Sequence, residues 1–421
     1  MEPRILNIGS EGPQSDILSQ SFSRATYSDF RKIHTHSPWS VRWEEVSPSE
    51  INNDFVRIPF PGTGDLLHAC YLVITINEGV SVVPPVASSV IREVVFRSDG
   101  DIIDKVDGEW IALSHDMERT YDENIGRDIL DLNVVEDPVT GKYTFDTTKS
   151  IIVDLPFWFR GGISRGMPIC GLEHGRHEIH IKTRLRCATG SDVPGTKNGI
   201  VDVKMIYEIS DVSTRDRHYL IGRDPRLLGR LGNTLPGGWK LSVTTRNRMI
   251  IPLEGRQTHS VILPYTNELV GVVFALRPIE QLRQGRFVRF DGRITDTRTE
   301  DDLDEQSVEP LYRDDTGELL EYAEITIGSH ILERREALWW RNESWRLSGR
   351  QPPDRYPFVY GRFWDIDQYI PSGGTYLEHL PRTELKVKLN CDSPDCELII
   401  WGIQRNEASI VDRKVILHHI I

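Results

Sequence analysis

The chain has 421 residues, more than one hydrophobic core normally organises, so two or three domains are expected. Charged residues make up 27% and apolar ones 38%, which is typical of a globular protein. The net charge of −13 argues against general binding to nucleic acid, and the absence of an 18-residue apolar run argues against a membrane-spanning helix. The five cysteines are sparse and odd in number, which fits free thiols in a reducing compartment.

Residues 1–50 are mixed and polar and lack strand periodicity, so we expect an N-terminal arm there. Trp39 and Trp43 are the arm's candidate contact residues. Strand signals begin after residue 54, and the run Leu66 to Ile76 is almost continuously apolar. Such a run predicts a strand that is buried on both faces. Strand-like segments continue through residues 101–117, and a charged excursion follows over 118–142.

Residues 151–184 predict a hairpin at the centre of a β-sandwich. An aromatic strand, a glycine-rich turn and a second strand follow one another in this stretch. In the second strand His177, Ile179 and Ile181 alternate with polar residues, which predicts one buried and one exposed face.

The second half repeats the style of the first, with short strand signals at intervals of about ten residues. No helical periodicity of twelve or more residues stands out. We therefore predict an all-β protein with a β-sandwich in each half. The expected parts are an arm (1–50), a first sandwich (51–209), an inter-domain segment (210–236) and a second sandwich (237–421).

The net charge is concentrated in one stretch. Residues 291–321 hold twelve acidic and three basic side chains, a balance of −9. A solvated surface loop is the expected interpretation. A calcium site or a binding tail is the alternative, but residues 301–305 lack the spacing of an EF-hand loop.

Chemical motifs are weak throughout. Ser164 lies in a G-x-S-x-G pattern, but a proline and a strand follow where a nucleophile elbow needs a helix. His174, His177 and His180 cannot converge on a metal from one face of a strand. Cys391 has only Cys396 nearby, so no zinc set is complete. We predict no catalytic, cofactor or metal site, and hence no enzyme.

Aromatic side chains leave one binding alternative open. Trp339, Trp340 and Trp345 could form a carbohydrate platform, although packing is the expected interpretation. A two-sandwich carbohydrate-binding protein or glycosidase therefore remains the alternative function.

A series of motifs resembles the major capsid proteins of nucleocytoplasmic large double-stranded DNA viruses, including iridovirus-like and algal-virus-like members. The resemblance runs along nearly the whole chain. The residues that carry it are Gly64, Asp65, Asp104, Leu155, Pro156, Phe157, Trp158, Phe159, Pro168, His177, Pro371, Ser372 and Gly373.

The resemblance implies a double jelly roll, that is, two eight-stranded antiparallel sandwiches side by side. It implies a shell subunit that self-assembles as a pseudo-hexagonal homotrimer and tiles an icosahedral capsid. Expected partners are neighbouring capsomers, minor capsid and penton proteins, and an internal membrane reached by the arm. No direct contact with nucleic acid is expected. The expected location is the virion, after assembly inside the infected cell, in the cytoplasm.

Overall fold

The computed structural model describes most of the chain from residue 39 onward. The described residues are 39–83, 85–118, 135–136, 143–145, 147–160, 166–172, 175–187, 199–214, 217, 239–253, 257–265, 267–283, 285–288, 290, 293–295, 308–310, 319–340, 357–361, 375–376, 382–390, 395–411 and 414–418. In this part of the chain, no helix has the length and apolar character needed to cross a membrane.

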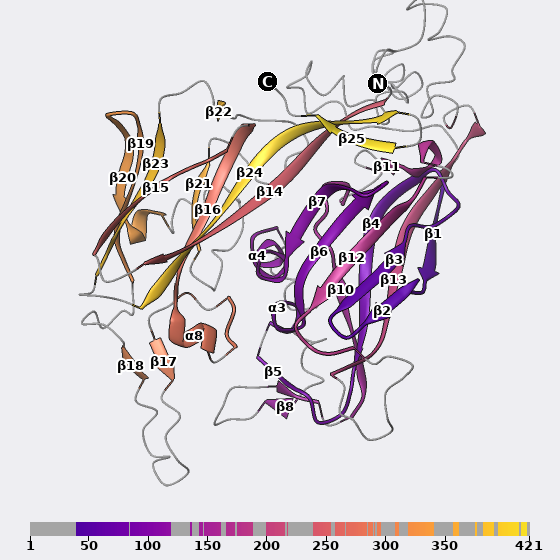
Figure 1. Ribbon diagram of the computed structural model, residues 1–421, viewed down its shortest axis with the longest axis horizontal. Coiled ribbons are helices and arrows are strands. Elements are labelled where there is room, and N and C mark those ends of the chain that lie inside the picture. Colours follow the sequence, from indigo (N-terminus) through magenta and orange to yellow (C-terminus); the bar gives the residue numbers. More distant parts are fainter. Residues whose placement is uncertain are drawn as a thin grey trace, which may run out of the picture.

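Two antiparallel β-sandwiches lie side by side (Figure 1). The first consists of two sheets that we name A1 and B1. Sheet A1 contains, in spatial order, β1 (Trp39–Val46), β13 (Ile200–Val212), β4 (Leu66–Ile76) and β10 (Lys149–Asp154), and β11 (Met167–Pro168) also pairs with β4. Sheet B1 contains β2 (Glu50–Asn52), β3 (Phe55–Pro59), β12 (His177–Thr183), β6 (Ile91–Ser98) and β7 (Asp101–Asp107).

The second sandwich is built from sheets A2 and B2. Sheet A2 contains β14 (Trp239–Leu253), β24 (Cys396–Val411), β16 (Glu268–Pro278) and β21 (Phe358–Gly361), while β22 (Thr375–Tyr376) pairs with β16 and β25 (Lys414–His418) with β24. Sheet B2 contains β15 (Thr258–Ile262), β23 (Thr383–Leu389), β19 (Leu320–Ile327) and β20 (His330–Glu336).

Shorter elements connect the strands. They are α3 (Val86–Val90), α4 (Gly108–Glu118), α8 (Ile279–Arg283), the 3-10 turn η3 (Ile169–Gly171), the small sheet of β5 (Ser81–Val82), β9 (Tyr143–Thr144) and β8 (Val135–Glu136), and the pair β17 (Arg293–Thr295) and β18 (Val308–Pro310). In Figure 1, α3 and α4 lie on the side of the first sandwich that faces the second.

Sheet A2 is buried on both faces along its central strands β24 and β16. Its inward side chains, such as Phe274 and Ile400, form a core with sheet B2. Its outward side chains, such as Val273, Ile399 and Trp401, belong to the same apolar cluster as the core of the first sandwich. The continuous apolar run of β24 follows from this double burial, because neither face of the strand meets water.

The predicted all-β class is confirmed, but three local predictions change. Residues 151–184 are not a hairpin, because β10 pairs with β4 in sheet A1 whereas β12 pairs with β3 and β6 in sheet B1. Between them, Leu155–Phe159 leaves the ladder at Pro156, which has no amide hydrogen to donate, and its aromatic rings are buried. The predicted alternation of β12 is confirmed: His177, Ile179 and Ile181 are buried.

The second change concerns residues 108–118, which form helix α4 and not a strand. The Asp107 carboxylate accepts a hydrogen bond from the Trp110 amide at 2.9 Å and so caps the helix N-terminus. The third change concerns the predicted arm. Its last residues belong to the sandwich, because β1 pairs along its whole length with β13, from Trp39 opposite Val212 to Val46 opposite Met205.

Candidate functional site at the joint between the two sandwiches

We call the contact between the two sandwiches the joint. On the first sandwich, it is formed by the turn from β7 into α4. Because Asp107 caps the helix, Glu109 falls in its first turn and points toward the second sandwich. Its side chain is 1% exposed, so its charge needs partners in the interior. The joint supplies these partners from three different elements.

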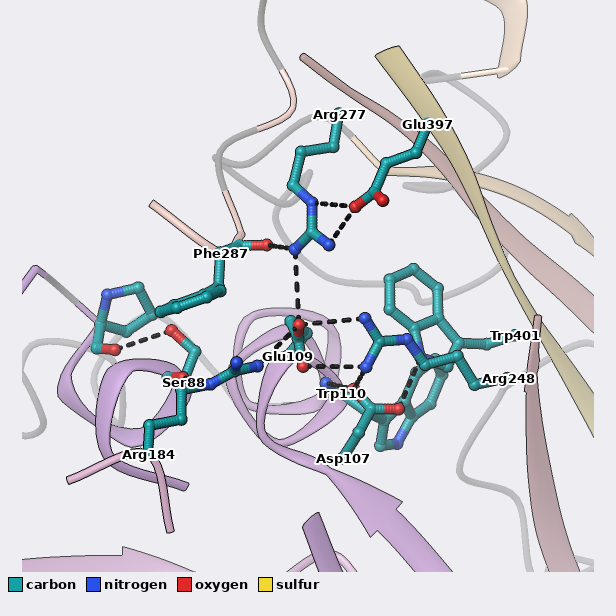
Figure 2. Close-up of polar contacts among 11 residues, drawn as sticks. Ser88, Asp107, Glu109, Trp110, Arg184, Arg248, Arg277, Phe287, Glu397 and Trp401 are labelled. Carbon is teal, nitrogen blue, oxygen red and sulfur yellow. Dashed lines mark hydrogen bonds and ion pairs between the residues drawn. The ribbon is translucent and has the colours of Figure 1, made fainter. Parts of the chain in front are cut away.

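Three arginines surround the Glu109 carboxylate (Figure 2). Arg248 on β14 binds it with both terminal nitrogens, at 3.1 Å and 3.0 Å. Arg184, just after β12, donates at 3.0 Å, and Arg277 on β16 lies at 3.4 Å. Two of the three arginines come from the second sandwich, so this one carboxylate connects the two sandwiches.

Two further carboxylates balance the arginines. Glu397 on β24 accepts a hydrogen bond from Arg277 Nε at 2.6 Å. Asp107 lies 3.6 Å from Arg248 and accepts the indole hydrogen of Trp401 at 2.9 Å. Three arginines therefore face three carboxylates, and the buried charges cancel formally.

Aromatic rings enclose this cluster. The rings of Trp110 and Trp401 lie 5.9 Å apart, one from each sandwich. The Arg246 guanidinium lies over the Trp110 ring at 5.5 Å, and that of Arg248 over the Trp401 ring at 5.9 Å. These contacts keep water from the ion pairs and strengthen them.

The protonation states follow from this environment. Burial alone would raise the pKa of Glu109, but the charges of Arg248, Arg184 and Arg277 outweigh burial and lower it. Burial raises the pKa of Asp107 to about 6 against the opposing charge of Arg248, and the nearby Glu109 charge adds to the rise. The pKa of Arg248 is raised by Asp107 and Glu109 despite its burial. Glu109 therefore stays ionised, whereas Asp107 titrates near neutrality.

A second connection joins the aromatic segment to the same strand β14. Arg246 donates to the Pro156 carbonyl oxygen at 2.9 Å. Burial raises the pKa of Asp104 to about 6, while the Arg246 charge and the backbone amides of Lys105 and Trp158 act to lower it. The joint thus combines ion pairs, stacked rings and backbone contacts, which is an arrangement suited to holding two bodies rigidly rather than to catalysis.

Comparisons with known proteins agree with this architecture. The family described as "Major capsid protein N-terminus" matches residues 46–212. A major capsid protein of Pyramimonas orientalis virus is 22% identical over 155 residues, which make up 36% of this chain and 38% of that protein. Residues 46–212 are thus similar to the N-terminal part of major capsid proteins.

Solved structures extend the likeness to the whole fold. A quasi-atomic model of the PBCV-1 virus capsid matches with a TM-score of 0.72 at 10% identity, covering 92% of this chain and 98% of that one. The Faustovirus major capsid protein matches with a TM-score of 0.64 at 11% identity, covering 97% and 99%. The predicted double jelly roll and the resemblance to major capsid proteins are confirmed. The matches give no support to the carbohydrate-binding or glycosidase alternative.

Within residues 46–212, the motif residues have structural roles that differ from one another. Gly64 has a positive φ of 119°, and a Cβ there would collide with the Ile209 side chain. Asp65 then binds the end of β13, because its carboxylate accepts the Val212 amide at 2.8 Å. These two residues attach the start of β4 to the end of β13.

The aromatic motif fills the first core. The Phe157 and Phe159 rings stack at 5.4 Å, and Trp158 meets Phe159 edge-on at 5.3 Å. Leu155 and Pro156 are buried beside them, and so is Pro168 in β11. His177 is also buried, and its Nε2 lies 3.1 Å from the Leu172 carbonyl oxygen.

Some predicted residues lie outside the described part of the chain. They are Pro371, Ser372, Gly373, Ser164, His174, Cys391, Trp345 and most of the acidic stretch 291–321. Among the described residues there is no group of three or more potential metal ligands. Trp340 is fully buried against Phe274, which agrees with the packing interpretation.

Sequence reasoning placed the nearby Asp104 in the motif series but did not indicate that Glu109 pairs with Arg184, Arg248 and Arg277. One signal existed for the arginines of β14: Arg246 and Arg248 are two residues apart and so share a face of the strand. Nothing in the sequence indicated that this face meets α4. The pairing joins residues 139 positions apart and depends on how the two sandwiches dock.

Proposed function

We propose that this chain is the major capsid subunit of a large icosahedral DNA virus and that it tiles the outer shell as pseudo-hexagonal homotrimers. The observation that carries the proposal is the rigid pairing of two sandwiches through a fully buried joint, in a fold shared along more than nine-tenths of the chain with the PBCV-1 capsid subunit. A shell tile has to keep its outline under load. Buried ion pairs with good geometry favour one orientation over others.

The proposed partners are other copies of this chain, in the trimer and in neighbouring capsomers. Minor capsid and penton proteins are further proposed partners, and the proposed location is the virion, after assembly in the cytoplasm of the infected cell. The net charge of −13 supports the proposal of no direct contact with packaged nucleic acid.

Electron microscopy of the purified full-length protein tests this function. The proposal expects three-chain particles with a pseudo-hexagonal outline that holds six sandwiches. Monomers that show no tendency to associate at any concentration would contradict it.

The arm is proposed to reach minor capsid proteins or an internal membrane. Trp39 and Trp43 remain candidate contacts, now as residues of β1, with Trp43 60% exposed. Deleting residues 2–35 leaves β1 intact, so trimers are expected to persist while shell assembly is impaired. Shell assembly that is unchanged by the deletion would refute this role.

A further inference from the structure

The two sandwiches are internal repeats with the same strand order. Sheet A1 runs β1, β13, β4, β10, and sheet A2 runs β14, β24, β16, β21. The short strand β11 joins the start of β4, as β22 joins the start of β16. Sheets B1 and B2 correspond in the same way, with β3, β12, β6 and β7 matching β15, β23, β19 and β20.

The correspondence holds residue by residue. The ladder of β4 with β13 skips one residue of β4 between Leu67 and Ala69, and the ladder of β16 with β24 skips one residue of β16 between Leu269 and Gly271. Counting from this shared bulge, Ile206 of sheet A1 matches Trp401 of sheet A2. The ladders of the N-terminal strands then match Trp43 with Arg246 and Glu45 with Arg248.

The same match holds for the segment of each sandwich that begins in an edge strand, β7 or β20, and continues into helical structure. Strand β7 has a bulge after Ile102 and β20 has one after Ile331, and each strand then runs into helical structure, at residue 108 and at residue 337. Counting from the bulges, Glu109 corresponds to Leu338, and Trp110 corresponds to Trp339. In the first sandwich these residues form the joint, whereas Leu338 in the second is 78% exposed.

The receiving face shows the same contrast. The outer face of sheet A2 is covered by the first sandwich. The outer face of sheet A1 carries Trp43 at 60%, Ile152 at 55% and Val41 at 41% exposed. The Trp43 ring lies 5.5 Å from that of Tyr71, on the strand position that matches Val273 of the buried joint.

The outer face of sheet A1 also holds an ion pair, between Lys204 and Glu45 at 2.9 Å, but it is less charged than the outer face of sheet B1. The outer face of sheet B1 has charged ladders, in which Glu93 pairs with Lys105 on one side and with Lys182, at 3.1 Å, on the other. Arg57 and Glu178 pair on the same sheet at 3.0 Å. Such a face is suited to water, whereas a half-exposed tryptophan beside isoleucine and valine is suited to a partner.

We propose that the β20 edge and following helical turn of one copy, residues 330–340, dock onto the outer face of sheet A1 of the next copy and thereby repeat the internal joint. This rests on the proposed homotrimer and identifies its contact surfaces. The occupant is a second copy because the described residues include a docking element and an exposed receiving face, each matching one half of the joint already formed. One surface of each copy meets a different surface of the next, so the contact closes into a ring when three copies complete six joints.

The chemistry changes from charged to apolar between the two joints. In the internal joint, Glu109 lies between Arg248 and Arg277. At the matching positions of the proposed interface, Leu338 would lie between Glu45 and Thr75, over Ile206. Where the Arg246 guanidinium covers Trp110, the Trp43 ring would cover Trp339. Apolar contacts can form between separately folded chains without leaving an ionised group buried and unpaired.

Substitutions on either side test the interface by analytical ultracentrifugation of the full chain. Leu338→Glu and Trp43→Glu are each expected to weaken trimer formation more than tenfold, with the circular dichroism spectrum unchanged because both side chains are exposed in the single chain. The matched control is Ile102→Glu, an isoleucine that is 51% exposed on the first sandwich and lies outside both surfaces. It should leave the trimer intact.

A rescue makes the test specific. Leu338→Glu combined with Glu45→Arg recreates the Glu109–Arg248 pair of the internal joint, so the double variant should recover trimers that Leu338→Glu alone has lost. A wild-type trimer that is unaffected by both single substitutions, or a loss that the rescue does not reverse, would overturn the interface and leave the proposed function standing. A wild-type chain that never associates would overturn both.

Discussion

At the scale of the residue, Glu109 is the side chain on which the joint depends most. It is 1% exposed and compensates three arginines, two of which belong to the other sandwich. Removing one partner from a buried ion cluster costs far more than breaking a pair at the surface, because the remaining charges stay in a medium that solvates them poorly.

Glu109→Gln is therefore expected to lower the free energy of unfolding by about 3–5 kcal/mol. Denaturant unfolding followed by circular dichroism measures this. Glu321→Gln is the control, since Glu321 pairs with Lys388 while 42% exposed, and its loss should cost less than about 1 kcal/mol. Equal effects of the two substitutions would contradict the importance of the joint.

The buried carboxyl group of Asp104 is expected to make the free energy of unfolding depend on pH. Its pKa in the folded chain is raised to about 6 from an ordinary 3.8 by burial, opposed by Arg246 on β14 and by the amides of Lys105 and Trp158. The folded carboxyl binds its proton more tightly than the unfolded one. Its contribution to stability is therefore complete below pH 3.8 and is lost as the pH rises through about 6.

Between pH 5 and pH 8, wild type should lose about 1–1.5 kcal/mol more unfolding free energy than Asp104→Asn, which cannot titrate. Unfolding curves at both pH values check this. Asp107 acts in the same direction and is present in both proteins, so the difference isolates Asp104. Equal losses in the two proteins would contradict the prediction, because they would show that the Asp104 carboxyl does not titrate in this pH range.

A substitution at Gly64 tests whether the positive φ and close packing at this position require glycine. Gly64→Ala should lower the free energy of unfolding by about 2–3 kcal/mol, because φ is 119° and the new methyl group would meet the Ile209 side chain. The neighbouring Gly62 has no atom within 4 Å of the position of an added Cβ. Gly62→Ala should therefore change thermal stability very little, and equal losses at both positions would contradict this account.

At the scale of the element, strands of the same sandwich meet different surroundings. β24 lies between two partners, β14 and β16, and both of its faces are buried along residues 396–401. β20 pairs with β19 at the edge of sheet B2, and six of its seven residues are exposed. Local stability should follow this difference in burial.

Hydrogen exchange of the Leu338→Glu variant should show the slowest amides in residues 398–401 and fast exchange in residues 330–336. In the wild-type trimer, the proposed interface adds protection to residues 330–340 and 39–46. Protection of these two segments that does not change on assembly would count against the interface.

At the scale of the whole molecule, the two sandwiches share one apolar cluster. Phe96 and Phe157 of the first sandwich and Trp401 and Ile403 of the second are all members of it. The joint is therefore not a linker between independent bodies, and neither sandwich buries its surface fully without the other.

Calorimetry of a chain kept monomeric by Leu338→Glu should show one cooperative transition. Trp401→Ala, which removes a fully buried side chain from the joint, should lower the temperature of the whole transition. Two separate transitions, with only the later one moved by Trp401→Ala, would show that the sandwiches unfold independently.

The sequence by itself determined the class of the protein. Short strand signals with period two, the absence of long helical periodicity and the motif series from Gly64 to His177 were enough to predict two β-sandwiches of capsid type, because alternation along a strand is a local property. The alternation of β12 follows from it directly.

Only the tertiary structure decided which strands pair and what the motifs do. The sequence suggested a hairpin at 151–184, but those strands belong to opposite sheets, since pairing depends on contacts between distant residues. Likewise, residues 107–110 were predicted only as part of a strand-like segment, and the structure shows that β14, β16 and β24 bring Arg248, Arg277 and Trp401 against them. A buried charge is recognisable only when its partners are in place, and here they come from the other sandwich.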